Sequence, residues 1–80
     1  MEPIQGSIMV FAGNFAPTGW AECNGQELTI ADNTGLFSII GTTYGGDGRM
    51  TFALPDYSKT NPFPGSIILI ATRGIYPARS

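Results

Sequence analysis

The stretch GSIILIA, Gly65 to Ala71, decides the fold that we expect, because it is more hydrophobic than the other extended runs of the chain. An unbroken apolar run of this length is typical of a strand buried on both faces. A second run, GSIMVFA from Gly6 to Ala12, matches it at glycine, serine, isoleucine and alanine, and also predicts a strand buried on both faces. Either the two runs are alike because buried strands resemble one another, or both occupy one sheet. In both cases we expect the first and last segments to meet.

The size of the chain limits what can stabilise it. Eighty residues form one domain, so we expect a single domain over residues 1–80. Such a chain buries only about 60% of its unfolded surface, and small domains usually rely on disulfides, metals or oligomerisation. A single cysteine, Cys23, excludes an internal disulfide, and the absence of histidine removes the commonest metal ligand and general base. Self-association is the remaining support.

Charge is scarce. Only 12% of the residues are charged and the net charge is −2, so part of the surface is expected to be covered by a partner. This balance gives no basic patch for nucleic acid. We expect no Sec signal, because Glu2 and Pro3 replace a positive leader segment, and no stretch long enough to insert into a membrane.

The first half of the chain carries two local signals. Asn24-Gly25 lies between two short extended runs and predicts a two-residue hairpin, with Trp20 and Glu22 on one side and Ala21 and Cys23 on the other. The segment LTIADNTGLFSIIG, residues 28–41, predicts a short helix. Its expected features are a Thr29 cap with Asp32 in the capping-box position, an apolar stripe of Leu36, Ile39 and Ile40, and a C-terminal Gly41; Gly35 could delay its start to Asn33.

The segment GTTYGGDGRMTFALPD, Gly41 to Asp56, combines a glycine-rich loop with a strand at 50–54 that Pro55 ends. A phosphate-binding loop needs a lysine and a serine or threonine after its last glycine, but Arg49 and Met50 follow here. A dinucleotide site needs a helix after the glycines, and a calcium site needs more oxygen ligands than Asp47 alone supplies. The loop is therefore expected to bend the chain, with Asp47 bonding the backbone of its own turn.

No residue pattern predicts catalysis. Cys23 has no histidine partner and is expected to be a small buried side chain, and the carboxylates show no acid–base spacing. Arg49 and Asp56 flank the 50–54 strand and could pair within or between chains, although two solvated side chains are the simpler interpretation. Trp20 could stack on a sugar, but core packing is the more common role of a single tryptophan. No metal site and no cofactor are expected.

Taken together, the motifs resemble the phage tail collar domain, including its microcystin-dependent branch. The resemblance lies in FAPTGW (15–20), CNGQ (23–26), Leu36-Phe37, GTTYGGDG (41–48) and TFALPD (51–56), and the closing IATRGIYPARS is similar to the end of that branch. It implies an α+β, mostly β module of short strands with one short helix, trimeric or otherwise oligomeric. The family offers no catalytic residues, and its motif is expected to consist of fold-defining turns: Asn24, Gly25, Gly45, Gly46, Asp47 and Gly48.

The chain departs from the family after Asp56. Relatives continue with a long variable stretch, whereas residues 57–65 form a short linker here, and histidine metal sites of some fibre tips are absent. A role as scaffold, plug, cap or repeating subunit is therefore expected in place of direct receptor binding.

Two functions remain open. The first is a structural, non-enzymatic protein of a phage tail fibre or tail-like appendage, made in the cytoplasm. It would form a homotrimer or a fibre and contact other tail proteins, and its apolar SIILIA strand could complete a neighbour's sheet. The second is a carbohydrate-binding adhesion module for cell-surface glycans. The candidate interface or ligand contacts are Trp20, Tyr44, Arg49, Asp56 and Tyr57.

Overall fold

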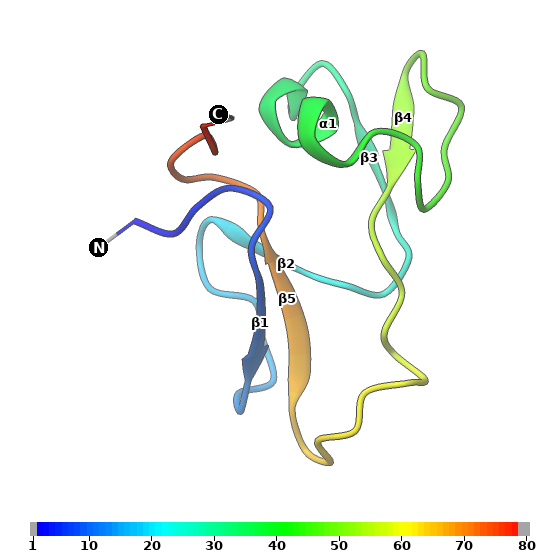
Figure 1. Cartoon of the computed structure of the whole chain (residues 1–80). Coiled ribbons are helices and arrows are strands. Elements are labelled where there is room, and N and C mark those ends of the chain that lie inside the picture. Colours follow the sequence, from blue (N-terminus) through cyan, green and yellow to red (C-terminus); the bar gives the residue numbers. More distant parts are fainter. Residues whose placement is uncertain (1, 79–80) are drawn as a thin grey trace.

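The computed structural model describes residues 2–78, which form a three-stranded antiparallel sheet and a smaller layer of two strands and one helix (Figure 1). The predicted fold class, mostly strands with one short helix, is confirmed. The elements are β1 (Ile8–Phe11), β2 (Trp20–Glu22), β3 (Glu27–Thr29), α1 (Thr34–Ile40), β4 (Thr51–Ala53) and β5 (Ile67–Ala71).

The larger sheet has the order β1-β5-β2, so the last strand of the chain lies at its centre. Ile8 pairs with Ile70 of β5, and Ala21 of β2 pairs with the same residue from the other side. The two similar sequence runs therefore share one sheet. Leu69 and Ile70 point to opposite faces and are both buried, which confirms a strand buried on both faces.

The first strand is not buried on both faces, contrary to the prediction. Ile8 and Val10 remain 47% and 46% exposed. They lie on the same face as Ile70 and Ile68, their partners in β5, which belong to or pack against the core. The small second layer covers β5 but leaves these two side chains of the outer strand partly in solvent.

The segments near the two termini are joined, as expected. Ile4 and Ile75 form a parallel bridge, in which the Gln5 N–H donates to the Ile75 carbonyl at 2.8 Å and the Ile75 N–H donates to the Pro3 carbonyl at 2.9 Å. The Gln5 side-chain amide adds a bond of 2.9 Å to the Thr72 carbonyl. Both segments lie at the same end of β1 and β5 in Figure 1.

The predicted Asn24-Gly25 hairpin is wrong. Only Gly25 has a positive φ (+81°), whereas a two-residue hairpin of this kind needs it at both positions. The flanking strands belong to different sheets: β2 pairs with β5, and β3 pairs with β4. The chain crosses from one sheet to the other at this point. Cys23 is buried as predicted, and Ala21 packs against the core.

The helix is shorter than its sequence signals indicate. Asn33, not Thr29, is its N-cap, and no side chain caps it. Thr29 ends β3 instead, where its hydroxyl donates to Asp32 at 2.9 Å. Gly41 is the C-cap, as predicted. The helix residues that face the core are Leu36, Phe37 and Ile40. The predicted stripe named Ile39 instead of Phe37, but Ile39 lies near Gly6.

The core lies between the two layers. Its buried cluster is drawn from both sheets and the helix, and consists of Cys23, Leu36, Phe52, Leu54 and Ile70. The ring of Phe37 packs on that of Phe52, with centroids 5.4 Å apart. The strand predicted at 50–54 is present as β4, and Leu54 and Pro55 continue into the core beyond it.

Candidate functional site

The glycine loop is organised around the carboxylate of Asp47. One oxygen, Oδ1, accepts the backbone N–H groups of Arg49, Met50 and Thr51 at 2.8, 2.9 and 3.0 Å. These bonds lower the pKa of Asp47 from its usual 3.8 to about 2, with the Met50 N–H contributing most. The N–H groups that could bind a phosphate are thus already occupied. The prediction that Asp47 bonds its own turn is confirmed.

The same loop covers the outer edge of β4. The Ala53 N–H donates to the Gly45 carbonyl, and the Gly48 N–H donates to the Thr51 carbonyl, both at 3.0 Å. Gly46 comes so close that a Cβ there would lie 2.4 Å from the Cα of Phe52. Only glycine fits at this position, because the loop backbone lies directly against the strand.

The Asn24-Gly25 turn and the Pro55-Asp56 segment form the joint between the sheets. The Gly25 N–H donates to the Pro55 carbonyl at 3.2 Å, and Asn24 bridges Asp56. Asp56 accepts the backbone N–H and hydroxyl of Ser58 at 3.0 and 2.6 Å, which lower the pKa of its carboxyl. These residues therefore connect the two layers of the fold.

Trp20 lies on β2, on the face of the larger sheet turned away from the core cluster. Its register partner Ala71 neighbours the core residue Ile70, so alternation places Trp20 and Ala71 on the opposite face. Trp20 is half-buried and lines a hollow of about 290 Å³ together with Glu2, Thr18 and Arg73.

The two candidate tyrosines lie near each other and apart from Trp20. Tyr57 packs against the core, and its N–H donates to the Cys23 carbonyl at 2.9 Å. The pKa of its hydroxyl is raised, first by loss of solvent and then by the neighbouring Tyr44 and Cys23. Tyr44 is 48% exposed, whereas Tyr57 is half-buried.

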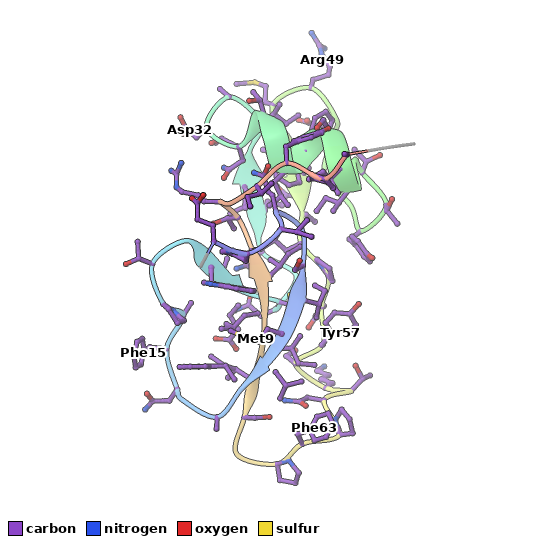
Figure 2. All side chains as sticks on the ribbon, turned by 60° about the vertical axis from the view of Figure 1, so that its left-hand side comes forward. Met9, Phe15, Asp32, Arg49, Tyr57 and Phe63 are labelled. Atoms are coloured by element: carbon purple, nitrogen blue, oxygen red, sulfur yellow. The ribbon has the colours of Figure 1, made fainter. Side chains whose placement is uncertain are left out.

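Arg49 and Asp56 lie beyond opposite ends of β4 and are both exposed. Figure 2 shows Arg49 at one extremity of the molecule, far from the labelled Tyr57. Arg49 contributes to a hollow of about 410 Å³ that also includes Asp32 and Met50. The structure therefore brings Tyr44, Tyr57 and the adjacent Asp56 to one region, and leaves Trp20 and Arg49 at separate places.

Reactive chemistry is scarce in residues 2–78. They contain no group of three cysteine or acidic side chains placed to hold a metal ion. Burial, followed by the nearby Glu22, raises the pKa of the Cys23 thiol to about 11, which keeps it protonated and unreactive at neutral pH. The helix found in this range is far too short to cross a bilayer.

Comparison with known families decides the relationship. A model of the phage tail collar domain matches residues 6–62, well over half of the chain. The chain belongs to the phage tail collar family. No curated protein matches this collar domain.

In this collar domain, the motif residues have structural contacts. The GTTYGGDG loop covers the edge of β4, and the CNGQ and LPD segments form the joint between the sheets. The family is a structural one of phage tail fibres, not a family of enzymes. The exposure of Ile8 and Val10 was not foreseen, because an unbroken apolar run does not reveal which face of a strand stays exposed. The sequence offered one indication of an uncovered apolar surface here, since no charged residue occurs from Pro3 to Ala21.

The Asp47 turn predicts a stability loss in acid. The pKa of Asp47 is depressed in the folded state, so its contribution is present above about pH 4 and is lost as the pH falls towards 2. We expect Asp47→Asn to unfold at a lower temperature than the wild type at pH 7. The difference should shrink between pH 4 and 2 in thermal melts followed by circular dichroism. A difference independent of pH would contradict this assignment.

Close packing of the loop predicts that two glycine substitutions differ. Gly46 and Gly65 both have positive φ, so an alanine at either costs about 1–2 kcal/mol of backbone strain. Nothing lies within 4 Å of a Cβ at Gly65, whereas Gly46 meets the β4 backbone. We expect Gly46→Ala to lose a further ~1–3 kcal/mol of unfolding free energy relative to Gly65→Ala in urea melts. Equal losses would show that the loop is not packed in this way.

Proposed function

We propose that this collar domain is a non-enzymatic structural protein of a phage tail fibre or tail-like appendage, and that it works by self-association. Family membership supports the tail role. The scarcity of reactive side chains and the use of the motif residues in folding support a structural task over a chemical one.

The observation that carries self-association is the uncovered surface of the folded chain. It exposes 5354 Å², whereas a folded monomer of 8.5 kDa is expected to expose about 4,700 Å². The excess is roughly 700 Å², so the chain is less well covered than an average monomer of its size. Large apolar side chains are exposed on this surface, including Ile4, Ile8 and Val10 on the N-terminal segment and Ile75 and Tyr76 near the other end.

The self-association surface is not the SIILIA strand expected from the sequence. Both edges of β5 are already paired within the chain, so β5 cannot complete a neighbour's sheet without leaving its own. Self-association must use an outer surface. The family resemblance favours three-fold symmetry, with the assembly placed in the virion tail beside other tail or appendage proteins.

The solution mass tests this proposal. We expect sedimentation equilibrium at micromolar concentration to give an integral multiple of 8.5 kDa, with a trimer as the unit implied by the resemblance. The same sample in electron microscopy distinguishes rings from fibres. A compact monomer across the micromolar range would refute the assembly role.

A second function, glycan binding, is favoured by the hollow beside Trp20. Its lining combines Trp20 with the polar residues Glu2, Thr18 and Arg73. An aromatic face combined with hydrogen-bonding groups suits a sugar, which has apolar C–H surfaces and polar hydroxyls. The short linker at 57–65 in place of a variable tip favours the structural role.

Substitution of the indole separates the two functions. If the hollow binds glycans, Trp20→Ala should weaken a hit from a glycan array about tenfold or more, whereas Trp20→Phe should keep most of the affinity because it retains an aromatic face. Fold retention is checked by circular dichroism. An array without hits, or equal binding by both variants, would exclude this site.

A further inference from the structure

An exposed phenylalanine lies at one extremity of the molecule, in the linker between β4 and β5. Phe63 is 54% exposed and stands between two prolines, and Figure 2 shows it at the end opposite to Arg49. It comes just after the residues that the collar model matches, so the shared motif does not account for it. Aromatic side chains are enriched where proteins contact one another.

The segment around this ring, residues 61–66, holds it in a fixed place, and we call it the Phe63 loop. The Phe63 N–H donates to the Asn61 side chain at 3.0 Å, and the Phe63 carbonyl accepts the Ser66 hydroxyl at 2.6 Å. The Asn61 side chain also donates to the Ser66 carbonyl at 3.0 Å, and the flanking prolines restrict the backbone. A partner therefore has little conformational freedom left to remove, which lowers the cost of binding.

The hollow of about 410 Å³ lies at the other end of the molecule, and we call it the Met50 hollow. Its lining includes Ile30, which follows β3, and Met50, which precedes β4 and is 73% exposed. The Ile30 N–H donates to the Met50 carbonyl at 2.9 Å and joins these two sides. Arg49 and Asp32 also belong to the lining, and Figure 2 shows both toward the end away from Phe63.

The chemistry of the Met50 hollow suits an aromatic ring. A methionine side chain adapts its shape, and its sulfur makes favourable contacts with ring edges. The guanidinium of Arg49 is attracted to the face of a ring. Charge also matches, because Lys59, the charged residue nearest to Phe63 in the sequence, is opposite in sign to Asp32. Phe63 and the hollow lie at opposite ends of one chain, so a ring that fits has to come from another copy.

We propose that the Phe63 ring of one copy docks in the Met50 hollow of the next copy, end to end. This inference rests on the proposed self-association and adds a contact along the assembly. The contact joins two different surfaces, so it does not close as a dimer. A pair of copies still offers a free Phe63 loop at one end and a free hollow at the other, and the contact repeats. It leaves the exposed Ile8 and Val10 of β1 available for a three-fold contact.

Three-fold symmetry strengthens such a contact. Copies that lie side by side about a three-fold axis, with their Phe63 loops at the same end, present three rings at one end and three hollows at the other. Successive trimers then stack through three equivalent contacts, and contacts that are weak singly become stable when they form together. The end-to-end contact thus extends a trimer into a fibre.

Loss of either surface tests this contact. Phe63→Ala removes the ring, and Met50→Lys places in the hollow a charge of the same sign as Lys59. We expect each variant to lower the mean mass in sedimentation velocity about two-fold or more, because its units no longer join. Thr60→Ala, at an exposed position beside the Phe63 loop, and Met50→Leu, which stays apolar, are the matched controls and should keep the wild-type mass. Circular dichroism verifies that each variant is folded.

A mixture of the two variants tests whether the contact joins different surfaces. The Met50→Lys copies still carry Phe63, and the Phe63→Ala copies still carry an intact hollow. The mixture therefore forms one end-to-end contact and then stops, which should raise the mean mass about two-fold over either variant alone. A contact between identical surfaces would not be restored by mixing.

The outcomes separate this contact from the self-association on which it rests. A folded Phe63→Ala variant with the wild-type mass, or a mixture no heavier than its components, would overturn the end-to-end contact. Self-association would still stand in that case if the wild type is oligomeric. A monomeric wild type would refute the proposed function and this contact with it.

Discussion

The fold depends on the insertion of β5 between β1 and β2. This strand is apolar on both faces, and each of its edges is paired, so it has to be covered on four sides at once. The pairing of Ile8 with Ile70 joins segments more than sixty residues apart. The first strand therefore has no pairing partner until the last strand is in place. The bridge between Ile4 and Ile75 joins the segments that precede β1 and follow β5.

The motif residues of the family take their roles from this arrangement. The smaller layer must be held against the larger sheet, and the turn at Asn24-Gly25 bonds to Pro55-Asp56 at the point where the chain crosses between them. The glycine loop protects the other side of β4, and Asp47 holds it closed with three backbone bonds. Residues that resemble a ligand-binding loop in sequence thus maintain the edge of a sheet.

What remains uncovered follows from the small size of the second layer. It shields β5 and leaves Ile8 and Val10 of β1 accessible. The described part of this collar domain therefore combines a β5 strand that is paired on both edges with an outer strand whose Ile8 and Val10 side chains stay partly in solvent.

The sequence by itself determined the strand character of the two apolar runs, their meeting, the short helix ending at Gly41 and the self-bonded turn at Asp47. These features depend on local chemistry: hydrophobic runs, a C-terminal glycine, and a carboxylate next to free N–H groups. Only the tertiary structure decided that Asn24-Gly25 joins two sheets instead of forming a hairpin, because strand partners compete across the whole chain and β5 takes β2. For the same reason the exposure of Ile8 and Val10 could not be predicted. Which face of an apolar strand is covered depends on how far a neighbouring layer extends, and no local pattern of residues records that distance.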